Sequence, residues 1–337
     1  GRALLQATGP VAGAARLIMG ALFPLKTREG LVRTIFMVAL ALVPLIASSS
    51  GEPFYIGFVA RIMIFGIAAV GLNFILGFGG MASFGHAAFI GLGAYVVGLS
   101  IHHGQSDGFV HLATVVAVSG FAAFVIGAVC LRTSGLYFIM ITLAFAQFLY
   151  FVGVGLKQYG GDDGLTFRGH SEFASWLDLG DAVTFYYVVW GVLAAVLFVV
   201  YRLVRSRFGM ALSGIRSNER RIQALGLPTY RYRLAAFVVS GMICGISGAL
   251  LANLTQLVSP AYMHWTRSGD LLIMVIMGGI SSVFGPVLGA TLLLLLEELL
   301  SAYSEHWQLL LGPILILVVL FAKQGLMSAF QIRGLRP

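Results

Sequence analysis

Few residues in this chain are placed for covalent chemistry. The segment Gly245-Ile-Ser-Gly248 has the Gly-x-Ser form that surrounds a serine nucleophile in membrane proteases. Such a serine needs a general base within hydrogen-bond reach. The histidines that follow Ser247 are His264 and His306, which fall in or beside expected outer loops rather than within an apolar run. This disfavours an intramembrane protease, and we expect no catalytic residue.

Nucleotide, metal and redox sites are not expected either. The chain has no Gly-x-x-x-x-Gly-Lys-Ser/Thr loop, the motif that cradles the phosphates of ATP, so it is not expected to bind ATP itself. Cys130 and Cys244 both sit in apolar runs without the spacing of metal ligands, which is typical of small core residues. We therefore expect no metal and no cofactor in this chain.

Some polar residues fall inside apolar runs and could instead serve transport. His86 stands beside Ser83 and is either a hydrogen-bonded packing residue, the more frequent case, or a proton carrier. Asn73 is expected to form hydrogen bonds between helices. Arg61 lies about six residues into its run, where it either extends toward the membrane surface or lines a cavity.

The composition is that of a membrane protein. Of 337 residues, 59% are hydrophobic and 10% are charged. Soluble domains contain about 45–50% apolar and about 25% charged residues. The formal charge of +8 does not indicate a nucleic-acid partner, because the basic residues fall in a few loops between apolar runs. We expect a lipid bilayer around the chain and no nucleic acid.

The predicted fold is all-α, a polytopic bundle of about ten transmembrane helices. A membrane crossing takes about 20 apolar residues. Ten apolar runs cover about 34–50, 55–76, 86–101, 110–131, 135–155, 184–203, 234–254, 269–282, 284–301 and 306–322. If one adjacent pair of short runs forms a re-entrant hairpin, eight full crossings remain, so the sequence allows eight to ten.

Charges predict the orientation. The segment 1–33 carries five Lys and Arg residues, which places it in the cytoplasm. Strict alternation then places Arg132, the eight arginines of 202–233 and the tail 323–337 inside, with the acidic stretch 162–181 outside. The permease domain would thus span 34–322, with both termini cytoplasmic. Because the chain opens at Gly1 without an apolar region ending in a cleavage site, we expect no cleaved signal peptide and a trimmed N-terminus.

Two glycine-rich breaks interrupt the apolar runs, one in each half of the chain, at 77–85 and at 278–286. Paired breaks of this kind indicate a substrate path in transporters. The alternative is that glycine permits close helix packing, as in Gly241-Met-Ile-Cys-Gly245 and Gly285-Pro-Val-Leu-Gly289. Candidate pathway residues are Asn73, Gly79, Gly80, Ser83, Gly85, His86, Gly278, Gly279, Ser281 and Gly285.

The loop 204–233 lies between two apolar runs on the basic side. Between Gly209 and Leu225 its apolar residues recur at helical spacing, and Gly226 followed by Pro228 would end the helix. This predicts one short amphipathic helix in the cytoplasm. It serves either as a contact for a partner or as a basic segment lying on anionic headgroups.

Ordered motifs along the chain resemble branched-chain amino acid ABC permeases of the LivM type. In the loop these are Arg207-Phe-Gly, Gly214-Ile-Arg, Asn218-Glu219 and Ala224-Leu-Gly226. Elsewhere they are Gly71-Leu-Asn-Phe-Ile-Leu-Gly77, Ser83-Phe-Gly-His-Ala-Ala-Phe89, Gly135-Leu-Tyr-Phe138, Thr142-Leu-Ala-Phe145, Gly160-Gly-Asp-Asp-Gly-Leu165 and Phe284-Gly-Pro286. The resemblance covers roughly residues 55 to 300.

The resemblance implies a bacterial inner-membrane complex. Its other members would be two cytoplasmic ABC ATPase subunits, a second homologous permease forming a heterodimer, and a periplasmic substrate-binding protein. It implies that the loop docks on the ATPase, with Arg216 and Glu219 making polar contacts while Ile215 and Leu225 fill a groove. The coupling residues would be Gly214, Ile215, Arg216, Asn218, Glu219, Ala224, Leu225 and Gly226. Arg220-Arg221 departs from the family pattern, in which acidic or alanine residues are frequent at these positions.

On the outer side, the resemblance implies that Asp162 and Asp163 contact the binding protein. The alternative is a solvated acidic loop ordered by its glycines. The loop from Ser259-Pro260 to Arg267 is the other candidate contact.

The function that these features indicate is an ATP-driven importer of branched-chain or related amino acids. Permeases for urea, short amides or aromatic acids are alternatives. An ion-coupled carrier or channel is an alternative of another class. Carriers often keep acidic residues at the midplane, and here Asp270, Glu297 and Glu298 lie toward segment ends.

Overall fold

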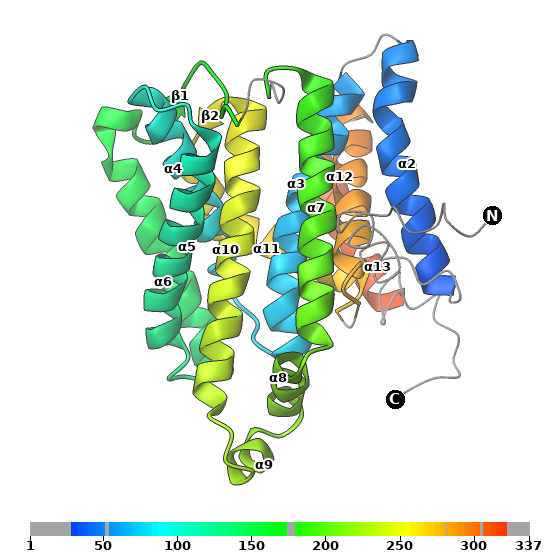
Figure 1. The fold of residues 1–337 in the computed structure, drawn as a ribbon. Coiled ribbons are helices and arrows are strands. Elements are labelled where there is room, and N and C mark those ends of the chain that lie inside the picture. The colour runs from blue at the N-terminus through cyan, green and yellow to red at the C-terminus, as the bar shows by residue number, and fades with distance from the viewer. Residues whose placement is uncertain (1–27, 51–53, 174–178, 281, 304–305, 322–337) are drawn as a thin grey trace, which may run out of the picture.

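We describe the protein from a computed structural model, which covers residues 28–50, 54–173, 179–280, 282–303 and 306–321 (Figure 1). In chain order its elements are α2 (Arg28–Ser50), α3 (Phe54–Asn73), the π-helix η2 (Phe74–Phe78), α4 (His86–His102), α5 (Gly108–Cys130), α6 (Leu136–Gly155), η3 (Lys157–Tyr159), β1 (Leu165–Thr166), α7 (Ala182–Val204), α8 (Arg207–Ser217), α9 (Glu219–Ala224), α10 (Thr229–Thr255), β2 (Leu257–Val258), η4 (Pro260–Met263), α11 (Trp265–Gly278), α12 (Gly285–Tyr303) and α13 (Trp307–Phe321).

Each of the ten predicted apolar runs carries a helix, so the protein is a polytopic helical membrane protein. Six helices are long and apolar enough to cross a bilayer alone: Phe54–Phe78, Gly108–Cys130, Leu136–Gly155, Ala182–Val204, Thr229–Thr255 and Gly285–Tyr303. Shorter apolar helices cover Gly30–Leu45, His86–His102 and Trp307–Ile316. The count of eight to ten crossings is not confirmed and stays a prediction.

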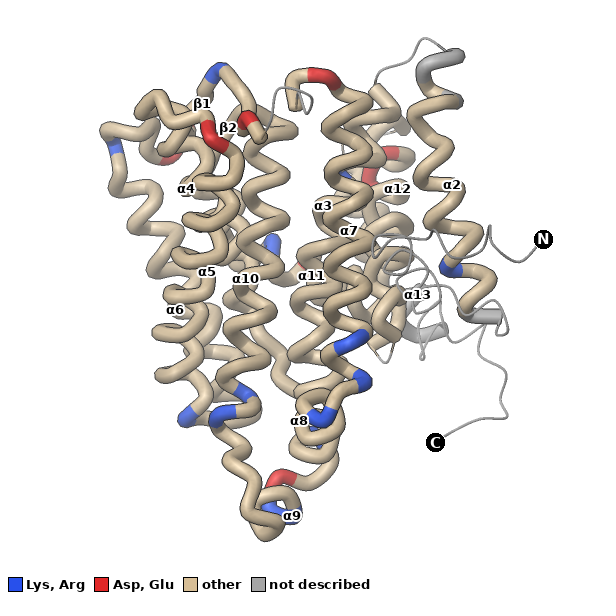
Figure 2. Tube along the Cα trace, viewed as in Figure 1, with Lys and Arg blue, Asp and Glu red and all other residues tan. Residues whose placement is uncertain are grey.

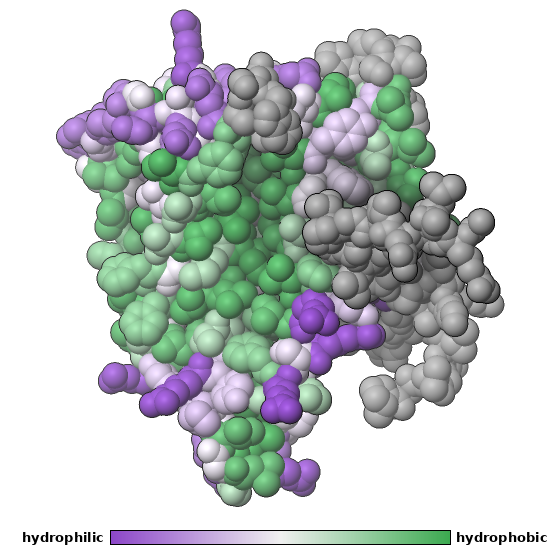
Figure 3. All heavy atoms as spheres, in the orientation of Figure 1, coloured by the Kyte–Doolittle hydropathy of each residue, from purple (hydrophilic) through white to green (hydrophobic). Residues whose placement is uncertain are grey.

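Helices α3 and α10 form the centre of the bundle. In their apolar windows 83% and 67% of residues are buried, against 22% in α6, which marks α6 as peripheral. α10 packs on α3, α4 and α5, while α7, α11 and α12 pack around α3. Figure 3 shows the outcome at the surface, a hydrophobic belt between two hydrophilic ends.

Three small polar side chains on α10 join it to α3. Ser240, Cys244 and Ser247 lie on one helix face and donate hydrogen bonds to backbone carbonyl oxygens of α3, at 2.6, 3.6 and 2.9 Å. The accepting carbonyls belong to Gly71, Ala68 and Ile64. Hydrogen bonds between helices of this kind stabilise bundles in lipid, where apolar contact alone gives little driving force.

Glycines bring α10 close to its other neighbours. Gly245 adjoins the backbone of Gly93 on α4, and Gly248 adjoins the backbone of Ile90. Gly241 and Gly245 also lie directly against Ala123 and Ser119 of α5, which supports the packing interpretation of this pair. Gly285 and Gly289 allow α12 to approach α11 in the same way.

The two ends of the bundle differ in charge (Figure 2). The end with α8 and α9 carries the eight arginines of 202–233, with Glu219 as the acidic residue of that loop. Arg132 follows α5, whose last turn is joined to the start of α10 by the hydrogen bond from the Tyr230 hydroxyl to the Ala128 carbonyl. The opposite end carries the two-residue strands β1 and β2, which pair antiparallel, and the acidic residues of the loops around them. The alternation of basic and acidic loops predicted from the sequence thus corresponds to opposite ends of the molecule.

A substitution pair tests the close approach of α4 and α10. We expect Gly248→Ala to lower the unfolding temperature in detergent, because the new Cβ would lie 2.7 Å from the carbonyl carbon of Ile90. Overpacking of this kind costs about 1–3 kcal/mol. Gly191→Ala on α7 is the control, since no atom lies within 4 Å of its added Cβ. Equal unfolding temperatures for the two variants would contradict this packing.

Candidate functional site

The loop between α7 and α10 contains two helices rather than the single amphipathic helix predicted. Ser206 caps α8 by accepting a hydrogen bond from the backbone N–H of Gly209 at 3.4 Å. Asn218 has extended backbone angles and caps α9 by accepting from the N–H of Arg221 at 3.0 Å. An asparagine that caps the second helix ends the first, which the apolar spacing alone does not reveal. Gly226, in the left-handed region at φ +81°, ends α9 as predicted.

We name α8, α9 and the turn at 224–226 the coupling tip. Its apolar residues face two ways. Leu212 and Ile215 are buried within the chain, where Ile215 is 2% exposed, so the expected contact of Ile215 with a partner is corrected. Ile215 instead fixes α8 against the bundle. Leu225 is 71% exposed, and Ala224 and Gly226 beside it are exposed as well.

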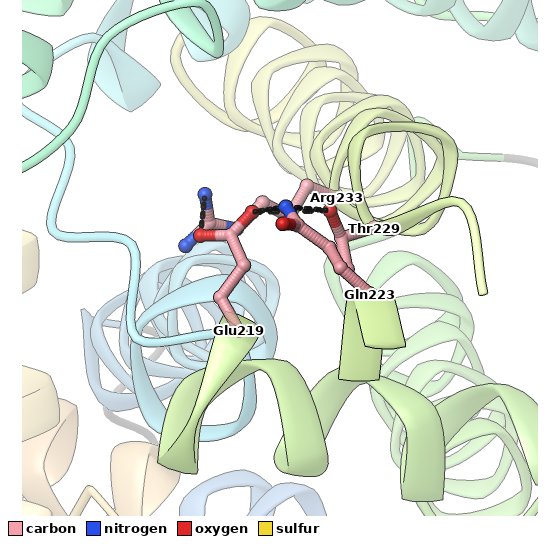
Figure 4. Close-up of polar contacts among 4 residues, drawn as sticks. All are labelled: Glu219, Gln223, Thr229 and Arg233. Carbon is pink, nitrogen blue, oxygen red and sulfur yellow. Dashed lines mark hydrogen bonds and ion pairs between the residues drawn. The ribbon is translucent and has the colours of Figure 1, made fainter. Parts of the chain in front are cut away.

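Glu219 connects the coupling tip to α10 (Figure 4). Its carboxylate pairs with the guanidinium of Arg233 at 3.0 Å and accepts a hydrogen bond from the hydroxyl of Thr229 at 3.1 Å. Gln223 donates to the Thr229 hydroxyl at 3.2 Å. The carboxylate is therefore already paired within the chain, so Glu219 holds α9 on the first turns of α10.

Arg216 connects the coupling tip to the first glycine break. Its guanidinium donates a hydrogen bond to the backbone carbonyl of Gly77 in η2. Its side-chain stem packs on Gly80, where an added Cβ would lie 2.9 Å from the Arg216 Cγ. Gly80 has φ +68°, a backbone conformation that favours glycine. One arginine therefore contacts both sides of the turn that ends η2.

The two glycine breaks meet each other. Asn73, at the end of α3, donates from its amide Nδ2 to the carbonyl of Ser282 at 2.8 Å. The hydrogen bond of Asn73, which was expected to join two helices, instead joins α3 to the segment between α11 and α12. Gly279, at φ +112°, ends α11, and Gly285 begins α12 against Gly278. Ser281, also a candidate pathway residue, lies outside the described residues.

His86 is the centre of a closed hydrogen-bond chain. Its Nδ1 lies 3.0 Å from the hydroxyl of Ser83, and its Nε2 lies 2.9 Å from the hydroxyl of Ser240. The Ser240 hydroxyl donates its proton to the carbonyl of Gly71, so Nε2–H donates to Ser240, and in the neutral ring Nδ1 then accepts from Ser83. Every proton in this chain has an acceptor, which supports the packing interpretation of His86 over the proton carrier.

Other partners of the first break were not predicted. The backbone N–H of Phe84 reaches the hydroxyl of Thr142 on α6 at 3.3 Å, and that of Ala87 reaches the hydroxyl of Ser268 on α11 at 3.0 Å. The signal for Ser240 was present, since Ser240, Cys244 and Ser247 recur at helical spacing within an apolar run. Thr142 and Ser268 are isolated hydroxyls, so no spacing marks them.

The candidate pathway residues are thus gathered at one junction, but most of them are enclosed. Asn73, Ser83 and His86 have no exposed surface, and Gly79 and Gly85 are buried. Gly278, Gly279 and Gly285 are buried too, whereas Gly80 is exposed beside Arg216. Their contact with a transported molecule stays a prediction.

At the opposite end, both candidate outer loops lie together. Asp162 and Asp163 are exposed in the glycine turn that leads into β1, and β1 pairs with β2, which precedes the loop at 259–267. Two further hydrogen bonds reinforce this connection. The hydroxyl of Ser171 lies 2.8 Å from Nδ1 of His111 on α5, and the backbone N–H of Ser171 donates to Oδ1 of Asn253 on α10 at 2.9 Å. These loops form one surface, called the hairpin end below.

Residues 54–320 match the family described as branched-chain amino acid transport system, permease component. The high-affinity branched-chain amino acid transport system permease protein LivM of Salmonella typhimurium is 30% identical over 288 residues, 79% of this chain and 68% of LivM. The Escherichia coli LivM is 29% identical over the same shares. The E. coli permease protein LivH is 28% identical over 163 residues, 48% of this chain and 51% of LivH. No solved structure gave a significant match.

The chain around His86 gives a prediction with a matched control on the same helix. We expect Ser240→Ala to lower the unfolding temperature more than Ser247→Ala. Loss of the Ser240 hydroxyl leaves both the Nε2–H of His86 and the Gly71 carbonyl short of a partner, and each buried unsatisfied group costs about 1–3 kcal/mol. Ser247 serves only the carbonyl of Ile64. The inverse order of unfolding temperatures would show that His86 does not depend on Ser240.

Proposed function

The chain belongs to the permease-component family of branched-chain amino acid transport systems, and from this membership we propose that it is one membrane-spanning subunit of an ATP-driven importer. ATP is hydrolysed by two cytoplasmic ABC ATPase subunits that are separate chains. A second homologous permease completes the membrane part as a heterodimer. The similarity of this chain to both LivM and LivH, two permease proteins of branched-chain systems, supports such a pair.

The observation that carries the proposal is the double attachment of the coupling tip. Arg216 attaches it to the first glycine break, and the Glu219–Arg233 ion pair attaches it to α10. Asn73 then continues the contact from the first break to the second. A force applied at the tip by an ATPase therefore reaches both breaks through hydrogen bonds and packed backbone, and movement of the breaks switches access from one side of the membrane to the other.

The charges at the two ends support a proposed orientation in the membrane. The coupling tip and its arginines face the cytoplasm of the bacterial inner membrane, and the hairpin end with Asp162 and Asp163 faces the periplasm and receives a substrate-binding protein. The segments 1–33 and 323–337 are proposed to be cytoplasmic as well. Most of the first and all of the second lie outside the described residues.

Branched-chain amino acids are the proposed substrates, with related amino acids next. The names of the similar permeases support this substrate class. Urea, short amides and aromatic acids are the alternatives within the same kind of transporter. Uptake of labelled leucine by the reconstituted complex, in competition with these compounds, separates them.

Docking on the ATPase can be tested at the exposed end of the coupling tip. We expect Leu225→Asp to abolish co-purification of the ATPase subunits, because a carboxylate would replace the exposed apolar side chain in a groove that excludes water. Leu225→Met keeps an apolar side chain and should retain the subunits. If Leu225→Asp co-purifies them as the wild type does, the tip is not the docking element.

The transmission of movement from the coupling tip to the glycine breaks can be tested separately from docking, by substituting Arg216. We expect Arg216→Ala to keep the ATPase bound but to lower uptake per ATP hydrolysed about fivefold or more, the range of typical coupling free energies. The reason is loss of the contact with Gly77. Arg202→Ala removes an exposed arginine at the same end and should leave the ratio unchanged. An unaltered ratio in Arg216→Ala would exclude this route.

A further inference from the structure

Charged residues lie inside the bundle at a place that the coupling tip and the glycine breaks do not include. Arg61 comes from α3, Arg267 and Asp270 from α11, and Glu297 from α12. All are partly buried, on helices that pack against one another. Ionisable residues within membrane helices are costly, and they commonly mark a substrate or ion path.

The pairing within this cluster is incomplete. Arg267 and Asp270 form an ion pair at 3.3 Å. The guanidinium of Arg61 lies 5.8 Å from the ring centre of Phe65, but it makes no hydrogen bond or ion pair with any described residue. The carboxylate of Glu297 has none within the described residues either, although its helix α12 packs on both α3 and α11.

The two unpaired groups lie at a similar depth. The Asn73–Ser282 hydrogen bond places the end of α3 beside the start of α12, so the two helices run in opposite directions. Arg61 is the eighth residue of α3, and Glu297 comes six residues before the end of α12. At 1.5 Å per residue each lies about 10 Å inside the same end of the bundle, which is the hairpin end.

A guanidinium and a carboxylate that lie at similar depth on neighbouring helices, without an ion pair between them, can each take one end of a ligand. We propose that Arg61 and Glu297 bind the carboxylate and the ammonium group of a zwitterionic amino acid as it enters from the hairpin end. Arg61 donates to the carboxylate, and Glu297 accepts from the ammonium. The Arg267–Asp270 pair borders the site, and Glu298, next to Glu297, adds a negative charge that favours the ammonium group.

This inference rests on the proposed transport function and names where the substrate is held within the membrane. It also accounts for the exposure of the two groups. Neither charged end is among the buried polar atoms that lack a partner in the described part of the chain, and both side chains are only partly buried. A purely structural role would instead join Arg61 and Glu297 directly, because their attraction is strong where water is scarce.

The test uses the purified permease–ATPase complex in lipid nanodiscs, without nucleotide and without binding protein. Binding is measured for leucine, for 4-methylpentanoate, which lacks the ammonium group, and for 3-methylbutylamine, which lacks the carboxylate. We expect wild type to bind leucine at least about tenfold more tightly than either half-ligand, since each charge-assisted contact is lost in one of them. Arg168→Gln, which changes an exposed arginine of an outer loop, should bind leucine as wild type does.

The variants make the assignment specific. Arg61→Gln should bind leucine and 3-methylbutylamine equally, and Glu297→Gln should bind leucine and 4-methylpentanoate equally. A fold defect would weaken all three ligands alike, and unfolding temperatures identify it. Unchanged leucine preference in both variants, or no leucine binding by wild type, overturns the inference. ATPase co-purification in the same samples reports on the proposed function separately, since it does not depend on Arg61 or Glu297.

Discussion

The hydrocarbon core of a membrane offers no hydrogen-bond partners, so every interrupted helix must find them within the protein. This constraint explains the arrangement around the two glycine breaks. Backbone groups freed at the first break are met by Thr142, Ser268 and Arg216, which come from three other helices, while Asn73 reaches across to the second break. The breaks are therefore held by side chains that belong to elements far apart in the sequence. A change in any of those elements changes the breaks.

Much of the helical architecture could be predicted because lipid imposes long apolar runs. The runs, the paired breaks and the basic loop all follow from composition and spacing, and each has a counterpart in the structure. The division of the loop at Asn218 could not be predicted, because a capping asparagine looks like any polar residue in an amphipathic pattern. The burial of Ile215 within the chain was also not predicted. Helical spacing tells which residues share a face of the helix, but not whether that face packs on the same chain or on a partner.

The residues of the candidate site could be predicted from the sequence better than the hydrogen bonds that they form. Asn73 and His86 were recognised as polar residues in apolar runs, but their partners Ser282 and Ser240 lie more than 150 positions away. Glu219 illustrates the same limit. The family resemblance implies a contact with another subunit, whereas the carboxylate is engaged by Arg233 and Thr229. Partners that lie far along the chain cannot be read from one sequence without a structure.

The antiparallel pairing of β1 with β2 is short, yet it fastens the segment before α7 to the segment after α10 at the end opposite the coupling tip. The bonds of Ser171 to His111 and Asn253 reinforce that fastening. The loop with α8 and α9 joins α7 to α10 at the other end, so the segments around these two helices are connected at both ends of the bundle. The separation of α7 from α10 is therefore restrained at the arginine-rich end as well as at the end with the two strands.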